Sequence, residues 1–156
     1  MKKEYSAQLL FSILTVALLP GIVAASLQPS SAVPLFDNLG GHHYAITTRV
    51  PLAQRYFDQG LRLYYAFNHA ESIRAFQEAF RLDADCAMCY WGLALAHGPN
   101  INAPMEREAA LAAYDAIQKA IAREGTANTK ERALIHALAA RYAAEPPEDR
   151  SSLDRA

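Results

Sequence analysis

The sequence predicts an all-α protein built from antiparallel helix hairpins. Apolar residues recur every three to four positions between residues 51 and 145, and proline and glycine interrupt this pattern at intervals typical of helix connections. No stretch alternates apolar and polar residues as a half-buried strand would. The spacing therefore predicts five amphipathic helices joined by short connections.

Residues 1–25 have the features of a processing signal. Lys2 and Lys3 precede an apolar run at 7–19, and small residues lead up to a cleavage site after Ala25. The run is shorter than the ~20 residues that span a bilayer. We expect a cleaved secretory signal and a periplasmic or secreted protein, with an uncleaved N-terminal anchor as the alternative.

The charge balance of the mature chain offers no electrostatic support for two classes of partner. Removal of Lys2, Lys3 and Glu4 from 15 basic and 16 acidic side chains leaves a formal charge of −2. This charge does not favour nucleic acid or an anionic lipid surface. We expect no nucleic-acid partner and no membrane insertion once the signal is cleaved.

The first helix pair follows an extended lead-in at residues 26–50. Pro51 suits the first turn of a helix predicted over about 51–66. Asn68 and Glu71 have the spacing of a capping box and predict a second helix that ends near Asp83. The apolar faces of the two helices comprise Ala53, Phe57, Leu61 and Tyr64, and then Ala70, Ile73, Phe76 and Phe80.

Three further helices complete the predicted helical domain over 51–145. Asp85 is the expected cap of a third helix that ends near His97, and a loop follows at 98–104. A fourth helix is predicted from about Met105 to Arg123, with Gly125 as its stop. A fifth starts at the Asn128–Glu131 capping spacing and ends near Ala144, before a linker at 146–156. Their stripes are Leu111, Tyr114, Ile117 and Ile121, and then Leu134, Ile135, Leu138 and Tyr142.

Residues 53–86 fit one unit of a repeat of about 34 residues. A large aromatic stands at Tyr56, a glycine at Gly60 where two helices approach, and small residues flank Phe76 at Ser72 and Ala79. This pattern resembles the tetratricopeptide repeat (TPR) family. More closely, the segments at 56–61, 67–71, 85–92 and 98–102 resemble exported bacterial TPR proteins of unassigned function.

The resemblance implies a right-handed solenoid of about two and a half repeats and a scaffold role. Such solenoids present a concave surface to a protein or peptide partner. We therefore expect an exported scaffold that binds a protein or peptide and has no catalysis and no cofactor of its own. Because at least three repeats are usual, we also expect a continuation of the repeat array beyond Ala156.

Cys86 and Cys89 form a C-x-x-C at the start of the third helix, where a helix N-terminus lowers thiol pKa values. Packed thiols or a structural disulfide are one reading of the pair. The alternative is a cell-envelope metal- or redox-handling protein that uses Cys86, Met88 and Cys89. A second pair of ligands, which a four-ligand metal site needs, is missing from the sequence.

The partner-binding candidates are Tyr56 and Tyr64 on the first helix and Asn100 and Asn102 in the long loop. Asparagine amides pair well with the backbone of an extended peptide. The aromatic residues would line a ligand groove. The competing readings are core packing for the tyrosines and turn stabilisation for the asparagines.

Overall fold

The computed structural model describes residues 33–102 and 104–156, and these contain helices but no β-strand. The prediction of an all-α fold is confirmed, whereas the predicted signal at 1–25 lies outside the described residues. Among the described helices, none is long and apolar enough to cross a membrane. The elements are α1 (Pro51–Tyr65), α2 (His69–Leu82), α3 (Ala87–His97), α4 (Arg107–Ile121), a 3-10 turn η1 (Glu124–Thr126), α5 (Thr129–Ala139) and α6 (Ser151–Asp154).

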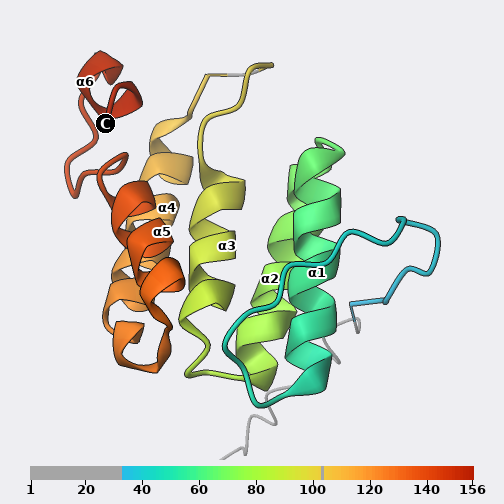
Figure 1. Ribbon diagram of the computed structural model, residues 1–156. Helices are drawn as coiled ribbons and strands as arrows, with labels where there is room; N and C mark the ends of the chain where they lie inside the picture. The colour runs from blue at the N-terminus through green and yellow to red at the C-terminus, as the bar shows by residue number, and fades with distance from the viewer. Residues whose placement is uncertain (1–32, 103) are drawn as a thin grey trace, which may run out of the picture. The chain divides into compact units, whose positions relative to one another are not determined.

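The five long helices of this part of the chain pack in two layers (Figure 1). Each helix contacts the next one in sequence, and α3 also contacts both α1 and α5. Helices α1, α3 and α5 therefore form one layer, and α2 and α4 pack behind them. The compact unit includes the described residues 33–50 and 146–156, which the sequence assigned to a lead-in and to a linker.

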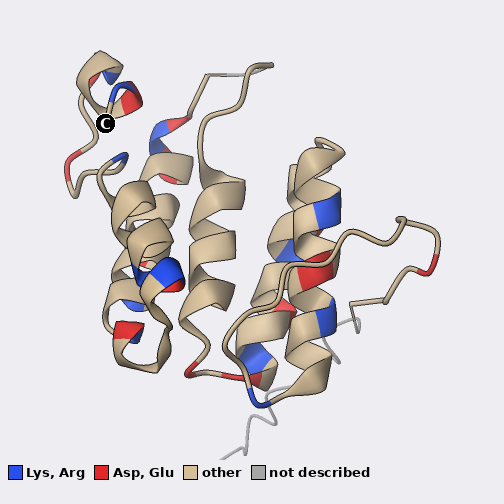
Figure 2. Cartoon of the chain, viewed as in Figure 1, with Lys and Arg blue, Asp and Glu red and all other residues tan. Residues whose placement is uncertain are grey.

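Helix α3 lies at the centre of this arrangement and carries no Lys, Arg, Asp or Glu, as its uniformly tan ribbon in Figure 2 shows. A helix that is apolar on all sides is one that neighbours surround. Seven of its eleven residues are buried. The charged side chains lie instead on the outer helices and on the turns.

Phe76 of α2 fills the space between α1 and α3. Its side chain is fully buried, and it meets the Phe57 ring edge-on at 5.5 Å. Gly60 and Gly92 face the same ring, and a Cβ atom at Gly60 would lie 2.7 Å from it. The Ser72 hydroxyl donates to the Gly60 carbonyl at 2.8 Å. The predicted close approach of helices at Gly60 is thus present.

The caps agree with the sequence at two helices and differ at a third. The Asn68 side chain accepts from the Glu71 amide, and Asn128 and Glu131 form a complete capping box. Asp85 was predicted to cap α3, and this was wrong: the Cys86 Sγ accepts from the Cys89 amide at 3.1 Å. Asp85 lies one residue too early, where its own amide is bonded to the Asp83 carboxylate.

The C-terminal helices are shorter than their apolar patterns suggest. Helix α4 covers 107–121 rather than 105–123, and Leu111, which we expected on its apolar face, is 41% exposed. Helix α5 ends at Ala139, not near Ala144, because the chain turns there and the Tyr142 hydroxyl donates to the Ala94 carbonyl at 3.0 Å. Tertiary packing of Tyr142 on α3 thus ends the helix.

Burial of Tyr142 gives the protein a defined response to alkali. Loss of solvation raises the pKa of the Tyr142 phenol to about 12, above its usual value of 10.0. The unfolded chain then loses this proton at a lower pH than the folded chain, so the stabilisation is complete below pH 10 and is lost as the pH rises towards 12. We expect the free energy of unfolding to fall across this window, and Tyr142→Phe to reduce the slope. Urea titrations at several pH values measure this pH dependence. Equal slopes in the wild type and in Tyr142→Phe would show that Tyr142 is not the titrating group.

The turn between α1 and α2 places a phenylalanine where glycine is usual. Phe67 has a φ of 59°, its amide donates to the Tyr64 carbonyl, and the next amide, that of Asn68, donates to the Leu63 carbonyl. These two bonds define a Schellman motif with Phe67 in the left-handed position. The ring is 55% exposed, so core packing does not explain the choice of residue.

Replacement of this phenylalanine should stabilise the fold. In the left-handed conformation a residue with a Cβ atom is destabilised by about 1–2 kcal/mol, and Phe67→Gly removes this cost. The greater freedom of glycine in the unfolded chain offsets part of the gain. We expect a net gain of about 0.5–1 kcal/mol in denaturant unfolding. Phe67→Ala is the matched control, because it removes the ring but keeps the strain. Equal stability of the two variants would show that the backbone is not strained.

Candidate functional site

Two short extended segments precede α1 and lie against it. We name residues 33–36 the arm and residues 42–47 the strap; the loop 37–41 that joins them is mostly exposed. In both segments burial alternates along the chain, with Val33 and Leu35 in the arm and Tyr44 and Ile46 in the strap turned towards the core. Figure 1 shows the strap crossing in front of α1.

Two glutamines of α1 hold these segments in the same way. The Gln59 amide nitrogen donates to the Pro34 carbonyl at 2.8 Å, and its oxygen accepts from the Phe36 amide at 2.8 Å. Gln54 bonds the Tyr44 carbonyl and the Ile46 amide, each at 2.9 Å. Each side chain therefore binds the carbonyl of one residue and the amide of the second residue after it, and these groups point the same way in an extended chain.

Asp58 and Arg62 continue the line of Gln54 along α1. Asp58 is buried, and its carboxylate accepts from the Tyr44 amide at 3.1 Å and lies 2.7 Å from the His43 imidazole. Arg62 donates to the His42 carbonyl at 2.7 Å. Four helical residues rise about 6 Å, close to the ~6.6 Å spanned by two extended residues. Side chains at every fourth position thus match every second residue of the strap, which runs antiparallel to α1.

Glu131 of α5 holds the other end of the strap. Its side chain is 1% exposed; one oxygen accepts from the Asn128 amide at 2.9 Å and the other from the Thr47 amide at 2.6 Å. The Lys130 ammonium lies 5.1 Å from the centre of the Tyr44 ring. The strap therefore joins α1 to α5. Both oxygens of the buried Glu131 carboxylate accept charge-assisted hydrogen bonds.

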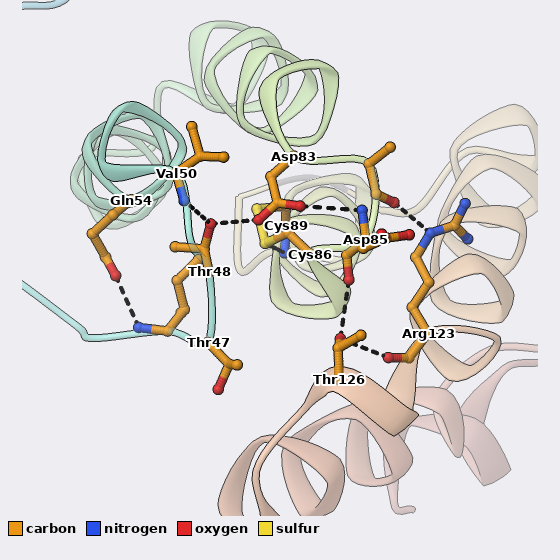
Figure 3. Close-up of a disulfide and its surroundings, with 12 residues drawn as sticks. Thr47, Thr48, Val50, Gln54, Asp83, Asp85, Cys86, Cys89, Arg123 and Thr126 are labelled. Carbon is orange, nitrogen blue, oxygen red and sulfur yellow. Dashed lines mark hydrogen bonds between the residues drawn. A yellow bond between two sulfur atoms is a disulfide. The ribbon is translucent and has the colours of Figure 1, made fainter.

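A polar cavity of about 560 Å³ lies where the strap, the α2–α3 turn and η1 meet (Figure 3). The groups around it are paired with one another: Thr48 donates to the Asp83 carboxylate, Thr126 to the Asp85 carbonyl at 3.0 Å, and Arg123 to the Ala84 carbonyl at 2.6 Å. These bonds connect three parts of the chain, so the polar groups around the cavity hold the turns together.

The cysteine pair lies beneath this cavity as a disulfide between Cys86 and Cys89. Both sulfurs and the Met88 side chain are buried, with exposed fractions of 1% or less. In this state neither sulfur is a thiolate, the form that binds metals. Among the described residues no three His, Cys, Asp or Glu side chains gather as a metal site.

Burial of the disulfide predicts slow thiol chemistry. Exchange requires a thiolate to reach one of the sulfurs, and both are shielded in the folded chain. We expect no thiol reactive with Ellman's reagent in the native protein, and reduction by dithiothreitol at least about a hundredfold slower than in denaturant. Rapid reduction under native conditions would instead favour the redox alternative.

The sequence-based binding candidates occupy different environments. Tyr56 is buried, and its hydroxyl donates to the Val33 carbonyl at 2.7 Å, so it contacts the arm. Tyr64 is half-buried, and burial raises the pKa of its phenol. Asn102 is exposed, and its amide donates to the Asn100 side chain at 2.9 Å, the bond of a stabilised turn. The structure does not bring the asparagines to the arm or the strap.

Apart from Tyr56, sequence reasoning missed the residues that bind the arm and the strap. Gln54, Asp58, Gln59 and Glu131 occur within helical patterns in which polar residues ordinarily face solvent. The available signal on α1 was the presence of polar residues four and five positions after Gln54, on a helix that also carries a full apolar face. Comparison of the chain with protein-family models, with curated proteins and with solved structures finds no match.

Proposed function

We propose that this chain is an exported helical-repeat scaffold of the TPR type that binds a protein or peptide partner and has no catalysis of its own. The observation that carries the proposal is the main-chain recognition on α1. Two glutamine amides and a buried carboxylate hold extended backbone through side-chain hydrogen bonds. A helix layer that binds one extended segment in this way has the chemistry to bind another.

The helix packing supports the TPR part of the proposal. Pairs α1/α2 and α3/α4 stack through α2 and α3, and the first helices of successive pairs also touch. Gly60, Ser72 and Phe76 lie where the repeat pattern expects a close approach, a small residue and an aromatic. Export, with a periplasmic or secreted location, rests on the signal features of residues 1–25.

Affinity capture tests the proposed function. The mature chain, tagged at its C-terminus, is used as bait in envelope and secreted fractions of the source cells, with an excess of untagged chain as competitor. We expect one or more proteins that the competitor displaces and that, once purified, bind the chain saturably in calorimetry. Absence of any saturable partner, together with turnover of a small molecule by the chain, would overturn the proposal.

A further inference from the structure

The arm is bound to α1 as a ligand is bound to a receptor. Its three hydrogen bonds to α1 come from Tyr56 and Gln59, at 2.7 to 2.8 Å. Gln59 is 2% exposed, so its amide is held in place and directed at the arm. A buried amide that uses both its donor and its acceptor on one extended segment is a preorganised recognition group.

The arm and the strap differ in how firmly they are tied to the fold. The strap continues directly into α1 and is also bonded to Glu131 of α5. Within the described residues, the arm is joined to the strap through the loop 37–41, where Gly40 has a φ of 78° and a Cβ atom added at Gly41 would have no neighbour within 4 Å. The arm can therefore leave α1 while the strap remains.

The bound arm shows which chemistry the site accepts. Val33 and Leu35 pack against the core, Pro34 supplies only a carbonyl, and Phe36 supplies the amide that Gln59 accepts. None of these four residues is charged. Beside the arm a cavity of about 150 Å³ continues between Phe36 and the side chains of Arg55 and Arg62.

We infer that the Tyr56 hydroxyl and the Gln59 amide form the binding site for an extended, uncharged strand of the partner protein, and that the arm occupies this site in cis. The inference rests on the proposed function and names its site and ligand class. A partner strand needs a carbonyl and, two residues later, an amide, with apolar side chains at alternate positions. Because the arm competes with the partner strand, the apparent association constant equals the intrinsic one multiplied by the fraction of molecules in which the arm is released.

A peptide with the sequence of residues 31–38 is the probe, labelled at its N-terminus and titrated into the mature chain by fluorescence anisotropy. Leu35→Ser loosens the arm without changing α1, so we expect at least a tenfold tighter Kd than for the wild type. Adding Gln59→Met, or methylating the Phe36 nitrogen of the peptide, should each weaken binding at least tenfold. Gln77→Met on the exposed face of α2 is the matched control and should leave the Kd unchanged.

Failure of the peptide to bind Leu35→Ser at millimolar concentration, or binding that survives Gln59→Met, would overturn the inference. Amide exchange of the unmodified chain gives a second test that needs no variant. We expect the Phe36 amide to exchange at least tenfold faster than the Ile46 amide, and equal rates would overturn it. The inference would also be overturned if the chain formed a dimer that Leu35→Ser dissociates, because the arm would then bind a second copy of the chain. If peptide binding fails while affinity capture yields a saturable partner, the proposed binding site is wrong and the proposed scaffold function stands.

Discussion

Gly92→Ala is expected to destabilise the protein by about 3 kcal/mol or more. A Cβ atom at this position would overlap the ring of Phe76, which is fully buried. The ring has no room to retreat, because Gly60 lies against it from α1. Alanine favours the helix over glycine by only about 1 kcal/mol, so the steric clash dominates. Urea unfolding of the protein measures the loss.

A double variant separates the clash from other effects of the substitution. Phe76→Leu removes part of the ring, so Gly92→Ala should cost at least about 1 kcal/mol less in its presence. Gly125→Ala is the control, since nothing lies within 4 Å of an added Cβ there, and it should change stability by no more than about 0.5 kcal/mol. Additive costs for Gly92→Ala and Phe76→Leu would mean that the two residues do not compete for space.

Glu131→Ala is expected to cost about 3 kcal/mol, because it removes two charge-assisted hydrogen bonds and leaves the amides of Asn128 and Thr47 without acceptors. Glu131→Gln keeps the shape but turns an amide donor towards one of these N–H groups, so we expect about half that loss. The Thr47 amide should also exchange with solvent faster in both variants.

Glu108 provides the comparison, since it too is an acidic residue in the first turn of a helix but is exposed. Glu108→Ala should change the free energy of unfolding by about 0.5 kcal/mol or less. Similar losses at Glu131 and Glu108 would show that the connection between the strap and α5 contributes nothing beyond an ordinary helix terminus.

The sequence by itself determined the features that depend on near neighbours along the chain. A helical apolar period and caps three residues apart predicted α1, α2 and the start of α5 correctly, because hydrogen bonds such as Asn128 to Glu131 form within one turn. The small residues at Gly60 and Ser72 likewise predicted a close approach of α1 and α2.

Only the tertiary structure decided which groups meet across the chain. Gln54, Gln59 and Asp58 look in the sequence like polar positions on any amphipathic helix, and their bonds to the arm and strap depend on where an aperiodic segment passes. The same holds for Glu131, whose second oxygen binds the Thr47 amide 84 residues away. The end of α5 was also decided in this way, since Tyr142 leaves the helix to reach α3. Long-range bonds between side chain and backbone have no period along the chain, so the sequence contains no regular pattern from which to predict them.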